Sequence, residues 1–196
     1  MNPPIKPLSP WWGFFAIFSI GFPLFFLLRP PPLEDYGALP SFSLVDQNNQ
    51  PISQADFQQE PSITNFIFTR CRDVCPALST RMAYIQESLP AAQLFSITVD
   101  PEYDRPAVLK DYGDRFQANH QSWRFVTGSK SQQDAITRGF QQAYERQSTR
   151  EENPKILHSQ KFILVDEKGH IRGFYPDNAS GTKKLISDYH SLKRFF

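Results

Sequence analysis

The pattern of apolar positions predicts an alternation of strands and helices between residues 41 and 196. The runs 62–69 and 94–99 are rich in β-branched and aromatic residues, which is typical of strands buried in a sheet. Between them, apolar side chains recur at helical spacing over 76–89. Further strands are expected at 41–45, 124–127, 161–165 and 171–175, and further helices at 104–116, 131–144 and 181–195. This order predicts an α/β fold with a mixed central sheet flanked by helices.

A separate apolar segment precedes this pattern. Residues 11–28 contain no charged side chain, and as a helix these 18 residues would span about 27 Å, close to the thickness of a hydrocarbon core. The segment therefore predicts one transmembrane anchor. A cleaved signal peptide is the alternative, but Arg29 and three prolines follow the segment where a small-residue cleavage site would be expected.

The anchor divides the chain into four predicted parts. These are a short cytoplasmic N-terminus (1–10), the anchor (11–28), a proline-rich linker (29–40) and one domain (41–196). Lys6 and the free amino group precede the anchor, which favours a cytoplasmic N-terminus over the opposite orientation. We therefore expect a single-pass protein of the inner (cell) membrane whose domain lies on the periplasmic side.

Composition narrows the function classes. Lys and Arg number 21 against 20 Asp and Glu, so the chain lacks the basic excess that holds phosphate backbones, and no nucleic-acid partner is expected. The 18 phenylalanines are ample for a folded core. The chain has only two cysteines, four positions apart, and a bridge that closes so small a loop cannot staple a domain. The two cysteines are better interpreted as a functional site.

Cys71 and Cys75 lie directly after a predicted strand and directly before a predicted helix. A helix N-terminus favours negative charge and lowers a thiol pKa, and Arg70 and Arg72 would act in the same direction if their side chains approach the sulfurs. The spacing lets both sulfurs converge on one point. The pair could therefore form a strained disulfide or chelate a soft ion such as copper(I) or zinc.

Among the four histidines, one is a candidate third donor. His120, His170 and His190 fall in polar contexts and are expected at the surface. His158 directly precedes the predicted strand 161–165 and could reach the sheet edge that carries the cysteines. From position alone it is either a ligand or an ordinary histidine at a strand entry.

A polar turn follows the second buried strand. The acidic residues between Asp100 and Asp104 could orient a group near the cysteines. The alternative is a turn in which Asp104 caps the following helix.

Four stretches of the chain resemble the SCO/SenC family, in the family's order. They are 66–76, 98–106, 123–129, and 157–159 followed by 162–166. The resemblance implies a thioredoxin-like fold on a membrane tether, and one copper ion per domain held by Cys71, Cys75 and His158. It also implies two protein partners, a copper donor and the cytochrome c oxidase subunit to which the copper is delivered during assembly.

The chain departs from the family pattern at three positions beside these residues. The family usually has His before the first cysteine, Pro after it and Asp before the distal histidine, where this chain has Arg70, Arg72 and Leu157. These changes keep two alternatives open. In one, the protein is a thiol–disulfide oxidoreductase in which Cys71 exchanges with a partner's disulfide and Cys75 resolves the resulting mixed disulfide. In the other, it is a non-catalytic redox or copper sensing module.

Overall fold

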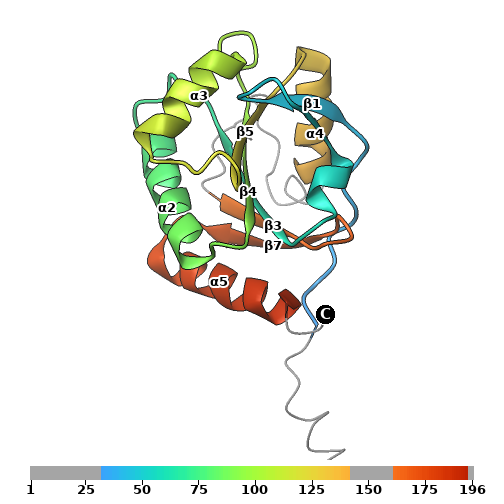
Figure 1. Cartoon of the computed structure of the whole chain (residues 1–196). Helices are drawn as coiled ribbons and strands as arrows, with labels where there is room; N and C mark the ends of the chain where they lie inside the picture. Colours follow the sequence, from blue (N-terminus) through green and yellow to red (C-terminus); the bar gives the residue numbers. More distant parts are fainter. Residues whose placement is uncertain (1–31, 142–160, 194–196) are drawn as a thin grey trace, which may run out of the picture. The chain divides into compact units, whose positions relative to one another are not determined.

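A seven-stranded mixed sheet crosses the part of the chain that the computed structural model describes, residues 32–141 and 161–193 (Figure 1). Its strands are β1 (Ser43–Asp46), β2 (Pro51–Ser53), β3 (Ser62–Ile67), β4 (Gln93–Thr98), β5 (Trp123–Thr127), β6 (Lys161–Val165) and β7 (Ile171–Pro176). They are ordered β2-β1-β5-β4-β3-β6-β7. β3, β4 and β5 are parallel, and the remaining pairs are antiparallel. The prediction of a mixed sheet is confirmed.

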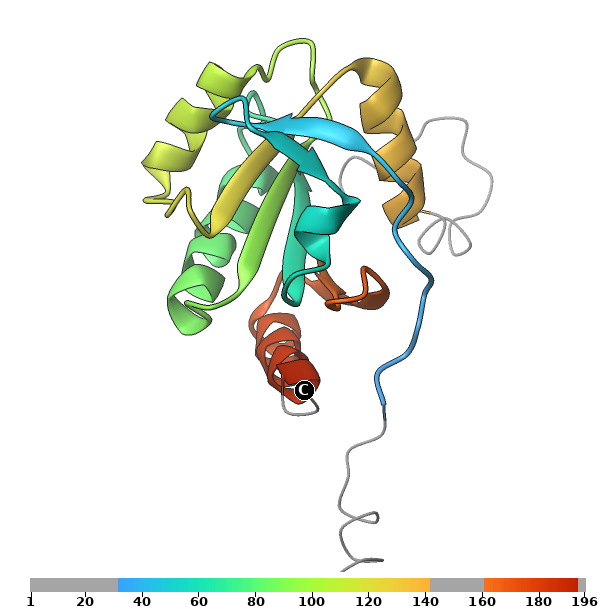
Figure 2. The ribbon, with the colours of Figure 1, turned by 45° about the vertical axis from the view of Figure 1, so that its right-hand side comes forward.

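Helices cover both faces of this sheet (Figure 2). They are α2 (Val74–Ser88), α3 (Pro106–Arg115), α4 (Lys130–Gln141) and α5 (Ala179–Lys193), with a short 3-10 helix η1 (Gln54–Phe57). One core cluster joins the sheet to α2, α3 and α5, and a second joins it to α4 and η1. The structure is therefore a helix–sheet–helix sandwich, as the alternation of elements predicted.

The central strands contribute to both cores because neighbouring side chains of a strand point to opposite faces. In β3, Ile63 and Ile67 pack with α2, whereas Phe66 packs on the α4 side. All six residues of β3 are buried, which explains why its sequence is rich in β-branched and aromatic residues on both faces. The same packing fixes where β3 ends, and the loop after it carries both cysteines.

Two local predictions are wrong. Asp104 does not cap α3: Arg105 occupies the N-cap position, and the Asp104 side chain is buried instead. His120 is not a free surface residue, because its ring contacts Gln47 at 3.1 Å and Asp114 at 2.7 Å. The exposed position of His190 on α5 is as expected.

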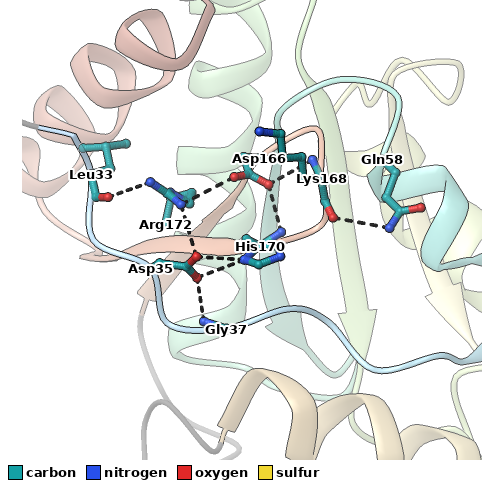
Figure 3. Close-up of polar contacts among 8 residues, drawn as sticks. All are labelled: Leu33, Asp35, Gly37, Gln58, Asp166, Lys168, His170 and Arg172. Carbon is teal, nitrogen blue, oxygen red and sulfur yellow. Dashed lines mark hydrogen bonds and ion pairs between the residues drawn. The ribbon is translucent and has the colours of Figure 1, made fainter.

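The segment 33–39, which the sequence analysis placed in a linker, is bound to the β6–β7 hairpin (Figure 3). Backbone bonds join Tyr36 N to Ile171 O at 2.9 Å and Ile171 N to Gly37 O at 3.0 Å. The Asp35 carboxylate lies between the His170 ring at 2.9 Å and the Arg172 guanidinium at 3.5 Å. The segment thus reaches β1 as part of the fold.

The predicted anchor 11–28 lies outside the described residues. Within residues 32–141 and 161–193, no helix has both the length and the apolar character needed to cross a bilayer.

Candidate metal centre

The two cysteines occupy the junction between β3 and α2. Cys71 lies in the loop, where its backbone N–H bonds to Phe68 O at 3.1 Å, and Cys75 lies in the first turn of α2. The backbone N–H of Cys75 donates to Cys71 Sγ at 3.4 Å. Both are free thiols; Cys71 is partly exposed and Cys75 is 1% exposed. The i, i+4 spacing therefore brings the two side chains together, as predicted.

Their surroundings give the two thiols different acidities. Partial burial alone would raise the pKa of Cys71, but hydrogen bonds from the backbone N–H groups of Cys75, Asp73 and Val74, and from the Cys75 thiol, lower it overall. Burial, and the proximity of Cys71, raise the pKa of Cys75 to about 12. The start of α2 thus stabilises one thiolate at the surface, beside a buried thiol that keeps its proton.

The two flanking arginines contribute less to this than the sequence suggested. Arg70 points to Asp100, with 2.5 Å between Nη2 and Oδ2, and its guanidinium lies 4.5 Å from the centre of the Tyr103 ring. Arg72 is exposed and has no ion pair among the described residues. The groups that lower the pKa of Cys71 most are backbone N–H groups of the helix start.

A buried carboxyl group fixes the base of the cysteine loop. Asp104 is fully buried and accepts hydrogen bonds from Thr69 N at 3.0 Å, from the Thr69 hydroxyl, and from Thr98 Oγ1 at 2.5 Å. These bonds join the loop to the end of β4 and the entry to α3. The acidic turn between Asp100 and Asp104 was expected either to orient a group near the cysteines or to cap a helix, and Asp104 does the first through its bonds to Thr69.

The described residues supply two sulfur donors. Among residues 32–141 and 161–193, no group of three or more His, Cys, Asp or Glu side chains could hold a metal ion. His158, the predicted third ligand, lies outside them. Paired sulfurs suit a soft ion such as copper(I), so the donors in place fit that metal chemically.

The family model described as SCO1/SenC matches residues 32–194. The chain belongs to the SCO1/SenC family. The resemblance drawn from the four stretches is thereby confirmed, and the mixed sheet with its flanking helices is the thioredoxin-like fold of this family.

Individual SCO1/SenC relatives cover most of the domain. An SCO2-like protein of Rickettsia felis is 31% identical over 145 residues, which are 70% of this chain and 69% of that protein. A candidate copper-binding protein of Stutzerimonas stutzeri is 32% identical over 141 residues, covering 69% of this chain and 68% of its own. The solved structure of BsSco is 25% identical with a TM-score of 0.70, and covers 86% of this chain and 99% of its own; it is described as having a disulfide switch and as a member of a family of cytochrome c oxidase assembly proteins.

Proposed function

We propose that this protein is a membrane-tethered copper chaperone that delivers copper to a cytochrome c oxidase subunit during assembly of the respiratory complex. The observation that carries the proposal is the convergence of Cys71 and Cys75 at the start of α2. The copper-binding description of the Stutzerimonas stutzeri relative and the oxidase-assembly role in the description of BsSco support it. The anchor 11–28 would hold the domain on the periplasmic side of the cell membrane.

Cys71, Cys75 and His158 each have a different part in holding one copper ion. Cys71 offers a thiolate that the backbone of α2 already stabilises, so it is the first point of attachment. Cys75 must lose its proton to become the second ligand, because only a thiolate binds the metal. His158 would complete a trigonal set, which copper(I) accepts. A site with one ligand at the surface can pass its ion to a partner by stepwise ligand exchange.

The test is a titration of the reduced full chain with copper(I) against a competing chelator. We expect one ion per chain, and a large loss of affinity in Cys71→Ser and in His158→Ala. His190→Ala is the matched control, since that histidine is exposed on α5, and it should bind as the parent does. A parent that binds copper no better than Cys71→Ser contradicts the proposal.

A second function is favoured by the asymmetry of the two thiols. A partly exposed thiol whose pKa is lowered, beside a buried thiol whose pKa is raised, is the arrangement of an attacking and a resolving cysteine. In this alternative the protein reduces a disulfide formed by cysteines of the partner protein. His158→Ala separates the two functions, because it should remove copper retention and leave disulfide exchange largely intact.

A further inference from the structure

A surface groove lies directly beside the exposed cysteine. It has a volume of about 490 Å³, and its lining includes Arg70, Cys71 and Arg72 from the cysteine loop and Tyr103, Tyr112 and Arg115 from the region of α3. We call these six residues the arginine groove. It is large enough for a small ligand or a few residues of a peptide.

The arginine groove is positively charged. Three of its lining residues are arginines, and no carboxylate lines it among the described residues. Asp100 pairs with Arg70 and does not itself line the groove. Arg72 and Arg115 are exposed, and neither forms an ion pair within residues 32–141 and 161–193. In this described part of the chain two guanidinium groups therefore lack a carboxylate partner beside Cys71, and such groups bind carboxylates in a forked geometry.

The dimensions of the groove suit an extended segment of chain. Val108 also lines it, so the lining follows α3 from Val108 to Arg115, seven residue steps that correspond to roughly 10 Å of helix. An extended peptide advances about 3.3 Å per residue, so about three residues span that length. Tyr103, Arg72 and Arg115 are all exposed at its rim. A groove with an exposed rim lets a longer chain continue past both ends.

We propose that the arginine groove binds an acidic, cysteine-bearing segment of the partner protein, and that Arg115 and Arg72 hold its carboxylates while its sulfur meets Cys71. The inference rests on the proposed function, because it describes the partner of the same site. It assigns a role to Arg72, one of the two arginines by which the loop departs from the family pattern. The charges of Arg72 and Arg115 select the partner, while the sulfurs perform the exchange.

The test measures disulfide exchange with synthetic hexapeptides. Each peptide carries one cysteine joined through a disulfide to 2-nitro-5-thiobenzoate, and the cysteine is flanked by Asp and Glu in one peptide and by Asn and Gln in the other. The Cys71 thiolate attacks the peptide sulfur, the S–S bond breaks, and the coloured thiolate leaves with the electron pair. Because the leaving group is common to both, the ratio of the two rate constants reports recognition of the acidic side chains alone.

We expect the acidic peptide to react about tenfold faster than the neutral one in the reduced full chain at low salt. This preference should shrink as ionic strength rises, because exposed charges are screened. Arg115→Gln should lower the preference about threefold, as the loss of one exposed ion pair implies, and Arg115→Glu should lower it further. Arg138→Gln is the matched control, an exposed arginine on α4 away from the groove, and should leave the preference unchanged.

The outcomes separate this inference from the proposed function. Arg115→Gln should bind copper as the parent does, since the substitution removes no ligand. A parent that binds copper but reacts equally with both peptides overturns the inference and leaves the function standing. A parent that prefers the acidic peptide but binds no copper supports the inference and contradicts the function. A small dicarboxylate disulfide that reacts as fast as the acidic hexapeptide also overturns the inference, because the groove would then take small anions.

Discussion

Asp104 offers the sharpest test of how the fold positions the cysteines. Its carboxyl group is fully buried and accepts hydrogen bonds from the backbone N–H and hydroxyl of Thr69 and from the hydroxyl of Thr98. Asp104→Ala removes all three acceptor contacts at once. Asp104→Asn keeps the shape and one oxygen, and a hydroxyl that loses its acceptor can rotate to accept from the new amide.

The expected loss in the free energy of unfolding follows from the number of hydrogen-bond donors that lose their acceptor. A buried donor that loses its partner costs about 1–3 kcal/mol. Two of the three donors belong to Thr69, which is only partly buried, so we expect the lower part of the summed range, roughly 3–5 kcal/mol, for Asp104→Ala. Asp104→Asn should cost about 1–2 kcal/mol, because the oxygen that remains can still accept from the Thr69 N–H and the Thr98 hydroxyl, and only the Thr69 hydroxyl loses its acceptor. Since a domain is stable by only about 5–15 kcal/mol, the alanine variant should be close to unfolding.

The assay is urea unfolding of the reduced chain, with the free energy of unfolding extrapolated to water. Asp111→Ala is the matched control, an exposed carboxylate on α3, and should change stability by less than about 0.5 kcal/mol. Asp104→Asn should also speed the alkylation of Cys75, because the attachment of its loop to β4 is weakened. If Asp104→Ala cost no more than the control, the attachment of the loop through this carboxyl group would be wrong.

Three further outcomes follow from the geometry. Iodoacetamide should modify Cys71 at least about tenfold faster than Cys75 in the reduced chain, as followed by mass spectrometry, and equal rates would contradict the difference in acidity and burial. Copper(I) affinity, corrected for the chelator's own protonation, should rise between pH 6 and pH 8, because the ion displaces the proton of a thiol whose pKa is about 12; a flat profile would show that Cys75 is not a ligand. Asp35→Asn should lower stability near neutral pH by up to about 1 kcal/mol in urea unfolding, since the pair with His170 is exposed. Bonds from the Gly37 N–H and His170 lower the pKa of Asp35, so this stabilisation should be complete above its ordinary value and vanish as the pH falls through the lowered one; a difference that persists in strong acid would exclude the pairing as its cause.

The central strands could be predicted because their signal is local. Residues 62–67 and 93–98 are buried on both faces, and their β-branched and aromatic runs mark them in the sequence. β2 and η1 gave no such signal. Each buries one large apolar side chain, Ile52 and Phe57, and pairing with β1 rather than local preference makes Pro51–Ser53 a strand. The role of Asp104 was hidden for a similar reason, because Thr69 lies 35 residues away in the chain.

The cysteine pair itself could be predicted, since i, i+4 spacing at a helix start places two side chains together whatever surrounds them. The directions in which the two arginine side chains point could not be predicted, because they depend on where other elements place acidic and aromatic side chains. Arg70 pairs with the Asp100 carboxylate and packs on the Tyr103 ring, and neither contact involves the sulfurs.

This arrangement changes how the loop's departure from the family pattern is interpreted. Two arginines beside a thiol that is proposed to bind copper would be expected to oppose a cation. Arg70 is neutralised by Asp100, however, and Arg72 lines an open groove that it shares with Arg115. The thiolate at Cys71 is stabilised chiefly by the backbone of α2, which these substitutions leave in place. The substitutions should therefore alter which partner approaches the sulfurs more than how tightly the sulfurs hold their ion.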